Sequence, residues 1–127
     1  MIADIIVAQQ ATINKNGDRI VVNPNNLFKV PAFPTAYSFS VSLVMSDLEP
    51  GDLDQISLKL EKKGETVRNL LQAGIPEDAK KHTNVALNIN VQNIEILASG
   101  KSSLVLLSND EELARKDIFF EKADLDN

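Results

Sequence analysis

The sequence feature that most constrains the fold is an alternation of large aliphatic residues with smaller or polar residues between positions 85 and 91. Aliphatic side chains occupy the odd positions from Val85 to Val91, whereas Ala86, Asn88 and Asn90 occupy the even ones. Successive side chains of a β-strand point to opposite faces, so a period of two predicts a strand with one apolar face. A helix would need apolar residues three or four positions apart.

The same period recurs in two other segments. Aromatic and aliphatic residues at the odd positions from 37 to 45 alternate with serines at 38, 40 and 42, and aliphatic residues occupy positions 56, 58 and 60. Pro50 and Gly51 lie between these segments and favour a turn, because proline fixes φ and glycine tolerates positive φ. These residues predict a strand, a turn and a second strand.

Turn chemistry also separates apolar runs at both ends of the chain. Asn16-Gly17 lies between the β-branched segment 2–13 and the run 19–22, and is a typical hairpin signal. The segment 23–34 carries three prolines, which predicts an extended connection or an interrupted edge strand. Gly100 lies in a turn between the apolar runs 94–97 and 104–107, and a last short apolar run follows at 118–120.

Many short strands separated by turns predict an all-β fold of mainly antiparallel strands, arranged as a β-sandwich. Two segments break the alternation. Residues 65–71 place Val67, Leu70 and Leu71 at helical spacing, and residues 110–116 are compatible with one exposed helical turn. We therefore expect at most one or two short helical segments. A single domain over residues 1–123 with a frayed tail at 124–127 accounts for the chain length.

The order of these signals resembles a family of small bacterial β-sandwich proteins of uncharacterised function. The resemblance rests on the Asn16-Gly17 turn, Leu27-Phe28 with Phe33-Pro34, a hairpin closing at Lys63-Gly64, the asparagine-flanked strand 84–90 and the turn at Gly100. It implies a compact β-sandwich and assigns no activity, so no functional residue is carried over. Segment 65–83 departs from the pattern of that family, because it is longer and partly helical in character.

Composition excludes several classes of function. The chain has no cysteine, so it has neither disulfides nor thiolate chemistry, which indicates a cytoplasmic protein. A net charge of −5 disfavours binding to nucleic acid, which depends on Lys and Arg contacts to phosphates. No apolar run is long enough for a membrane helix, and the start Met1-Ile2-Ala3-Asp4 lacks the features of a signal peptide.

No catalytic site is predicted, and we expect a protein that is not an enzyme and binds no cofactor. His82 is the single histidine and lies in a polar stretch suited to a solvated loop. A general base also needs a nucleophile and an orienting partner within reach. The sequence contains no glycine-rich phosphate loop and no G-x-S-x-G nucleophile motif.

One acidic turn is a candidate cation site. Asp47, Glu49, Asp52 and Asp54 flank the Pro50-Gly51 turn, and Ca²⁺ takes several carboxylate oxygens from loops of this kind. The competing interpretation is that aspartate, proline and glycine are ordinary turn residues, and the spacing is not that of an EF-hand. A Ca²⁺-binding or small-ligand-binding β-sandwich that uses this 47–54 loop is therefore the alternative function.

The remaining candidate binding surface is formed by main-chain groups of the strand 85–91. If the strand 85–91 lies at the edge of a sheet, its unpaired N–H and C=O groups can accept a strand from a partner. Asn88, Asn90 and Gln92 give it a neutral polar face that does little to repel such pairing. The competing interpretation is an interior strand with solvated amides. We hypothesise a non-enzymatic interaction or structural module of bacterial or mobile-element origin, which binds a protein partner or forms a homodimer.

Overall fold

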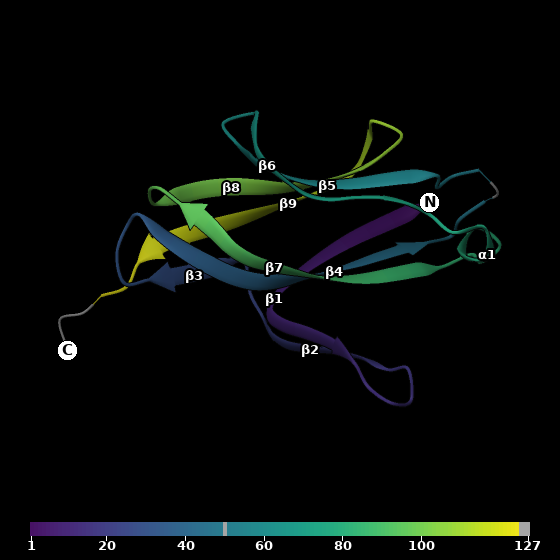
Figure 1. The fold of residues 1–127 in the computed structure, drawn as a ribbon, viewed down its shortest axis with the longest axis horizontal. Helices are drawn as coiled ribbons and strands as arrows, with labels where there is room; N and C mark the ends of the chain where they lie inside the picture. Colours follow the sequence, from purple (N-terminus) through teal and green to yellow (C-terminus); the bar gives the residue numbers. More distant parts are fainter. Residues whose placement is uncertain (50, 125–127) are drawn as a thin grey trace. The chain divides into compact units, whose positions relative to one another are not determined.

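The computed structural model describes residues 1–49 and 51–124, and these residues form an all-β chain (Figure 1). The prediction of the fold class is confirmed. Within the described residues there are nine strands and one four-residue helix: β1 (Ile2–Ile13), β2 (Arg19–Pro24), β3 (Leu27–Val30), β4 (Thr35–Ser46), β5 (Gln55–Lys62), β6 (Glu65–Gly74), α1 (Glu77–Lys80), β7 (Val85–Ile96), β8 (Gly100–Ser108) and β9 (Glu111–Lys122).

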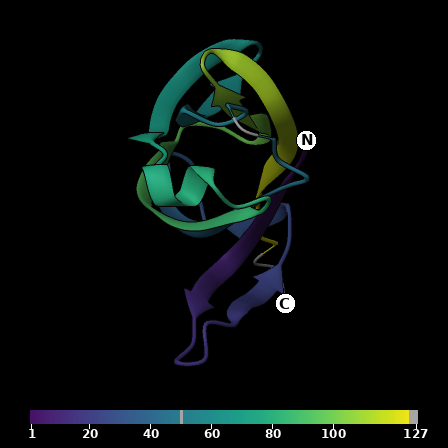
Figure 2. The ribbon, with the colours of Figure 1, turned by 90° about the vertical axis from the view of Figure 1, so that its right-hand side faces the viewer.

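The strands form the two sheets of a β-sandwich. One sheet has the order β2-β1-β4-β7, and the other has the order β3-β9-β8-β5-β6. The pairs β1–β2, β5–β6 and β5–β8 are antiparallel, whereas β3 runs parallel to β9. The alternating segments identified in the sequence correspond to β4, β5 and β7, and the Asn16-Gly17 turn closes the β1–β2 hairpin (Figure 2).

The described residues cluster into two compact units. The first comprises Met1–Ile5, Leu43–Leu87 and Ser103–Lys116, and the second comprises Ile6–Ser42, Asn88–Ser102 and the described residues from Asp117 onward. Each unit has its own apolar core. The prediction of one domain over residues 1–123 stays a prediction. Of the predicted tail 124–127, residues 125–127 lie outside the described part of the chain.

The core of the first unit is aliphatic. In β5 every second residue from Ile56 to Leu60 is buried, whereas in β8 the residues 103–106 are buried in a row. Leu58 and Leu106 lie directly opposite each other, so their side chains share a face of the sheet. The largest fully buried side chains among the described residues of this unit are Leu43, Met45, Ile56, Leu58, Leu104 and Leu106.

The core of the second unit is aromatic. Phe28 of β3 lies at its centre, with its ring centroid 5.1 Å from that of Tyr37 and 5.6 Å from that of Phe39 on β4, and 5.7 Å from that of Phe120 on β9. These tilted and stacked arrangements join strands of both sheets. Burial raises the pKa of the Tyr37 hydroxyl above its usual value.

Both helical expectations were wrong. Residues 65–71 belong to β6, which pairs with β5, and residues 111–116 belong to β9. Tight turns explain both results. Lys63 and Gly64 have φ of 54° and 80°, and Asn109 and Asp110 have φ of 50° and 67°, so each pair returns the chain as a hairpin. The hydrogen bonds that neighbouring strands supply override the local helical spacing.

Segment 65–83, which departs from the pattern of the bacterial family named above, contains both β6 and the short helix α1. Within residues 65–83, α1 follows β6 after Pro76, which is a residue favoured at helix starts. Lys80 at its end contacts the carboxylates of Asp54, at 3.0 Å, and Glu77, at 3.1 Å. The hydrogen bonds to these two carboxylates, that to Asp54 first, raise the pKa of the Lys80 ammonium.

Candidate functional site

Strand β7 lies at an edge of the four-stranded sheet. This position settles the question that the sequence left open, in favour of the edge strand over the interior strand. The two edges of the five-stranded sheet are protected in known ways. β3 has four residues and is followed by Pro31, and β6 carries charged residues and pairs with β5 through two register shifts. β7 has twelve residues, and Glu95 is its one charge.

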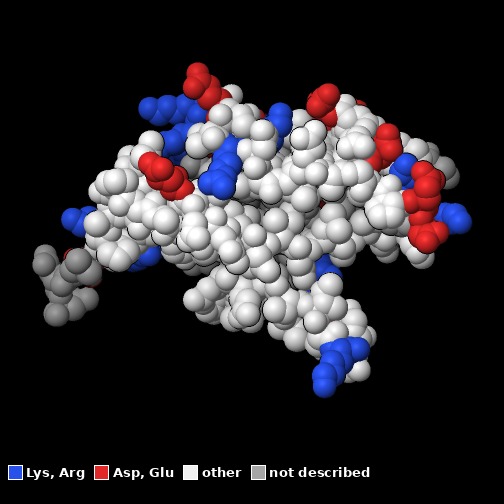
Figure 3. Space-filling view, viewed as in Figure 1, with Lys and Arg blue, Asp and Glu red and all other residues white. Residues whose placement is uncertain are grey.

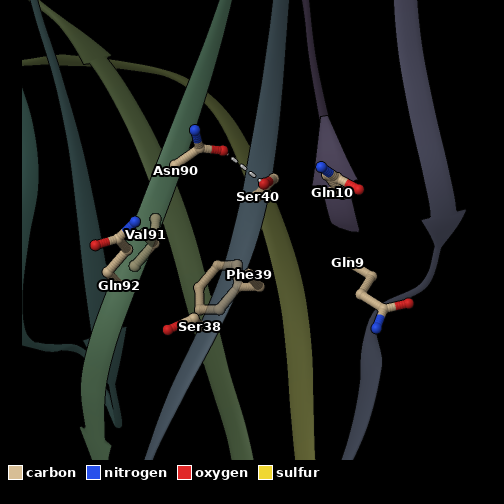
Figure 4. A pocket seen from close by; sticks show the side chains of 8 residues that line it. All are labelled: Gln9, Gln10, Ser38, Phe39, Ser40, Asn90, Val91 and Gln92. Atoms are coloured by element: carbon tan, nitrogen blue, oxygen red, sulfur yellow. Dashed lines mark hydrogen bonds between the residues drawn. The ribbon is translucent and has the colours of Figure 1, made fainter. Parts of the chain in front are cut away.

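The side chains of Asn88 and Asn90 turn toward the neighbouring strand β4. The hydroxyl of Ser42 donates to Asn88 Oδ1 at 2.8 Å. The hydroxyl of Ser40 donates to Asn90 Oδ1 at 2.8 Å, and Figure 4 shows this second hydrogen bond. The two pairings run in opposite sequence directions, as antiparallel neighbours require. The carboxamides therefore lie over β4, on the side of β7 away from its outer edge.

A guanidinium extends the polar cluster. Arg19, the first residue of β2, donates from Nη2 to the hydroxyl of Ser42, which in turn donates to Asn88. Within the described residues, Arg19 forms no ion pair with a carboxylate. Arg19 Nε and Asn88 Nδ2 are buried and have no hydrogen-bond partner in the described part of the chain. A buried donor without a partner keeps its desolvation cost, so these two groups lower the free energy of unfolding.

A shallow polar groove of about 500 Å³ lies beside this cluster in the second unit (Figure 4). Ser38, Ser40, Asn90 and Gln92 contribute hydroxyl and amide groups from β4 and β7, and Gln9 and Gln10 line it from β1. Phe39 and Val91 complete the lining. None of these side chains titrates near neutral pH, so the groove can form hydrogen bonds but offers no general acid or base.

A bulge ends the regular part of the β7 edge. Asn93 has φ of 55°, and its main-chain N–H donates to the hydroxyl of Ser38 at 3.0 Å. The buried face changes phase here, because Val91 is followed by Ile94 and Ile96 as the next buried apolar residues. Bulges of this kind interrupt pairing, so the edge available to another strand ends near Gln92.

The four carboxylates of the acidic turn do not converge. The Asp52 carboxylate accepts the main-chain N–H of Glu49 at 2.8 Å, and Asp54 contacts Lys80. Asp47 lies at the end of β4, where its N–H is 3.4 Å from Asn84 Oδ1. Among the described residues, no group of three His, Cys, Asp or Glu side chains is placed to hold a metal ion. The structure thus supports the interpretation of these residues as turn residues, and the cation hypothesis stays a prediction.

His82 is exposed and lies beside the same turn, near Glu49 and Lys80. In the described part of the chain, no helix is long and apolar enough to cross a membrane. No protein-family model, no curated protein and no solved structure matches this chain.

Sequence reasoning found Asn88, Asn90 and Gln92 but missed their partners. The serines at 38, 40 and 42 were recognised only as the residues that alternate with the apolar positions of β4, yet Ser40 and Ser42 are buried. No sequence pattern indicated that Arg19 belongs to this site, because one arginine after a hairpin turn is an ordinary surface residue. The regular serine spacing at 38, 40 and 42 was the available sign, since hydroxyls in a row can pair with an opposing row of amides.

Proposed function

We propose that this chain is a non-enzymatic interaction module whose β7 edge accepts an extended strand from another protein chain. The observation that carries the proposal is the orientation of Asn88 and Asn90, whose carboxamides bind Ser42 and Ser40. A side chain that is held over β4 neither covers the main chain of the edge nor competes for its hydrogen bonds.

The chemistry of the edge supports the same function. Residues 85–92 contain neither a charge nor a proline, and the bulge begins only at Asn93. In strand addition, main-chain hydrogen bonds supply affinity and neighbouring side chains supply selectivity. The groove of hydroxyls and carboxamides beside β7 favours a partner strand with neutral polar side chains, because a charged group would find no counter-ion there.

Site-specific photo-crosslinking in the producing cell tests this function. A benzophenone amino acid replaces Gln92, which is exposed on β7, and the matched control carries it at Gln72, exposed on the edge strand β6. We expect a discrete adduct from position 92 and none from position 72. Ala86→Lys, at an exposed position of β7, should abolish the adduct, because a lysine on an edge opposes strand pairing.

Hydrogen exchange supplies the second measurement. In the purified crosslinked complex, we expect every second amide among residues 88–92 to exchange more slowly than in the free chain, since the added strand accepts hydrogen bonds from the N–H groups that face outward from β7. Equal adducts from positions 92 and 72, or an adduct that survives Ala86→Lys in a folded protein, would show that the edge is not the binding surface.

A further inference from the structure

The β1–β2 hairpin has two different faces within the second unit. Arg19 and Val21 are half-buried, whereas Ile20 and Val22 are 42% and 41% exposed. The register of the hairpin places Ile20 opposite Thr12 and Val22 opposite Gln10, so these four residues share one face. The exposed face of β2 is therefore formed by two β-branched aliphatic side chains.

This face belongs to an edge strand that has no neighbour on its outer side among the described strands. A β-branched pair on a free edge offers both apolar surface and unpaired main-chain groups to another strand. The charges of the hairpin are few: Lys15 and Asp18 lie in the turn, and Arg19 is bound to Ser42. In Figure 3 the visible face of this hairpin is white apart from basic side chains near its turn.

The sequence of β2 is complementary to itself when it runs antiparallel about Val21. In that register Ile20 of one copy lies opposite Val22 of the other, and this pair occurs twice. Asn23 has φ of 52°, so the regular register covers Ile20, Val21 and Val22, and no like charges face each other within it. Opposed β-branched residues stabilise antiparallel strands, whereas like charges directly opposite destabilise them.

We propose that two copies of this chain pair through their β2 strands, antiparallel and about a two-fold axis at Val21. A two-fold axis makes the same surface serve both subunits, which is the commonest way that soluble chains associate. Because the strand has six residues, the interface is small, and the dimer is weak and depends on concentration. This pairing uses β2 and not β7. An experiment can therefore disprove the β2 dimer without disproving strand addition at β7, and the reverse.

Sedimentation velocity over a concentration series tests the pairing. The wild-type chain should shift toward the dimer as concentration rises. Ile20→Lys with Val22→Lys should weaken association by about tenfold or more, because each lysine then faces a lysine of the other copy. Val67→Lys is the matched control, since Val67 is 57% exposed on β6, and it should associate as the wild type does.

Charge reversal tests the register directly. The variant Ile20→Glu with Val22→Glu should also be monomeric alone, yet an equimolar mixture with the double lysine variant should form a heterodimer. Circular dichroism confirms that each variant is folded. A wild-type chain that stays monomeric at high micromolar concentration, a double lysine variant that still associates, or a mixture that stays monomeric would each overturn the proposal.

Discussion

At the scale of single residues, the hydroxyl of Ser42 joins Arg19 and Asn88, each of which has a buried nitrogen without a partner among the described residues. It accepts from Arg19 and donates to Asn88. Its side chain is fully buried although it alternates with core residues. A buried polar group that loses its partner bears the whole desolvation cost, whereas replacement of both partners by apolar groups can be nearly neutral.

We expect Ser42→Ala to lower the free energy of unfolding by about 1–3 kcal/mol, because it leaves the Asn88 carboxamide buried without a partner. The double variant with Asn88→Leu should recover part of this loss. Urea denaturation of the two single variants and the double variant gives the coupling energy. Strictly additive effects would show that the two side chains do not interact.

A second prediction concerns the apolar residues of β7. The alternation alone suggests that Leu87→Ala and Ile89→Ala each cost about 2–5 kcal/mol as core truncations. Both residues are only half-buried, whereas Ile94, beyond the bulge, is 2% exposed. We now expect the full cost for Ile94→Ala and a smaller one for Ile89→Ala, measured by urea denaturation. The reverse order would contradict the phase change at Asn93.

At the scale of elements, tight turns decide where strands replace the expected helices. The β5–β6 turn places Lys63 in the left-handed region, which costs a residue with a Cβ about 1–2 kcal/mol. Gly64 follows it with φ of 80° and meets no steric obstacle there. The hairpin thus forms although Lys63 disfavours a positive φ, and the pairing of β5 with β6 stabilises it.

Lys63→Asn should therefore stabilise the protein by a few tenths to about 1 kcal/mol, because asparagine tolerates positive φ and completes the Asn-Gly turn signature. Gly64→Ala should destabilise it by about 1–2 kcal/mol for the same reason. Thermal unfolding of both variants shows whether each substitution raises or lowers the stability of the protein. An asparagine variant that unfolds at a lower temperature than the wild type would contradict the assignment of this turn.

At the scale of the whole molecule, the net charge of −5 suggests binding of cations, but the acidic residues described here are engaged locally or dispersed. Asp52 accepts a hydrogen bond within its own turn, and Asp54 pairs with Lys80. Among the described residues, these carboxylates form no group of three or more side chains placed to hold a metal ion.

The cation hypothesis predicts that millimolar Ca²⁺ raises the melting temperature, since a ligand that binds the folded state stabilises it, and an unchanged temperature would contradict it. The variant Asp52→Asn with Asp54→Asn serves as the control and should behave identically with and without the ion. A Ca²⁺-dependent rise in the wild type that this variant abolishes would establish the 47–54 loop as a cation site.

The sequence by itself determined the strands β4, β5 and β7, the β1–β2 hairpin and the all-β class. Alternation and turn residues act over a few neighbouring positions, so they can be recognised without knowledge of the partner strands. Asn88, Asn90 and Gln92 were recognised in the same way, as neutral residues on one strand.

Only the tertiary structure decided which strands lie at the edges and which polar residues are buried. The edge position of β7, the burial of Ser40 and Ser42 and the contact of Arg19 with Ser42 all depend on which strands become neighbours. The same holds for β6 and for residues 111–116 of β9, where hydrogen bonds to adjacent strands outweigh helical spacing. Strand pairing joins residues far apart in the chain, and local pattern carries no information about such partners.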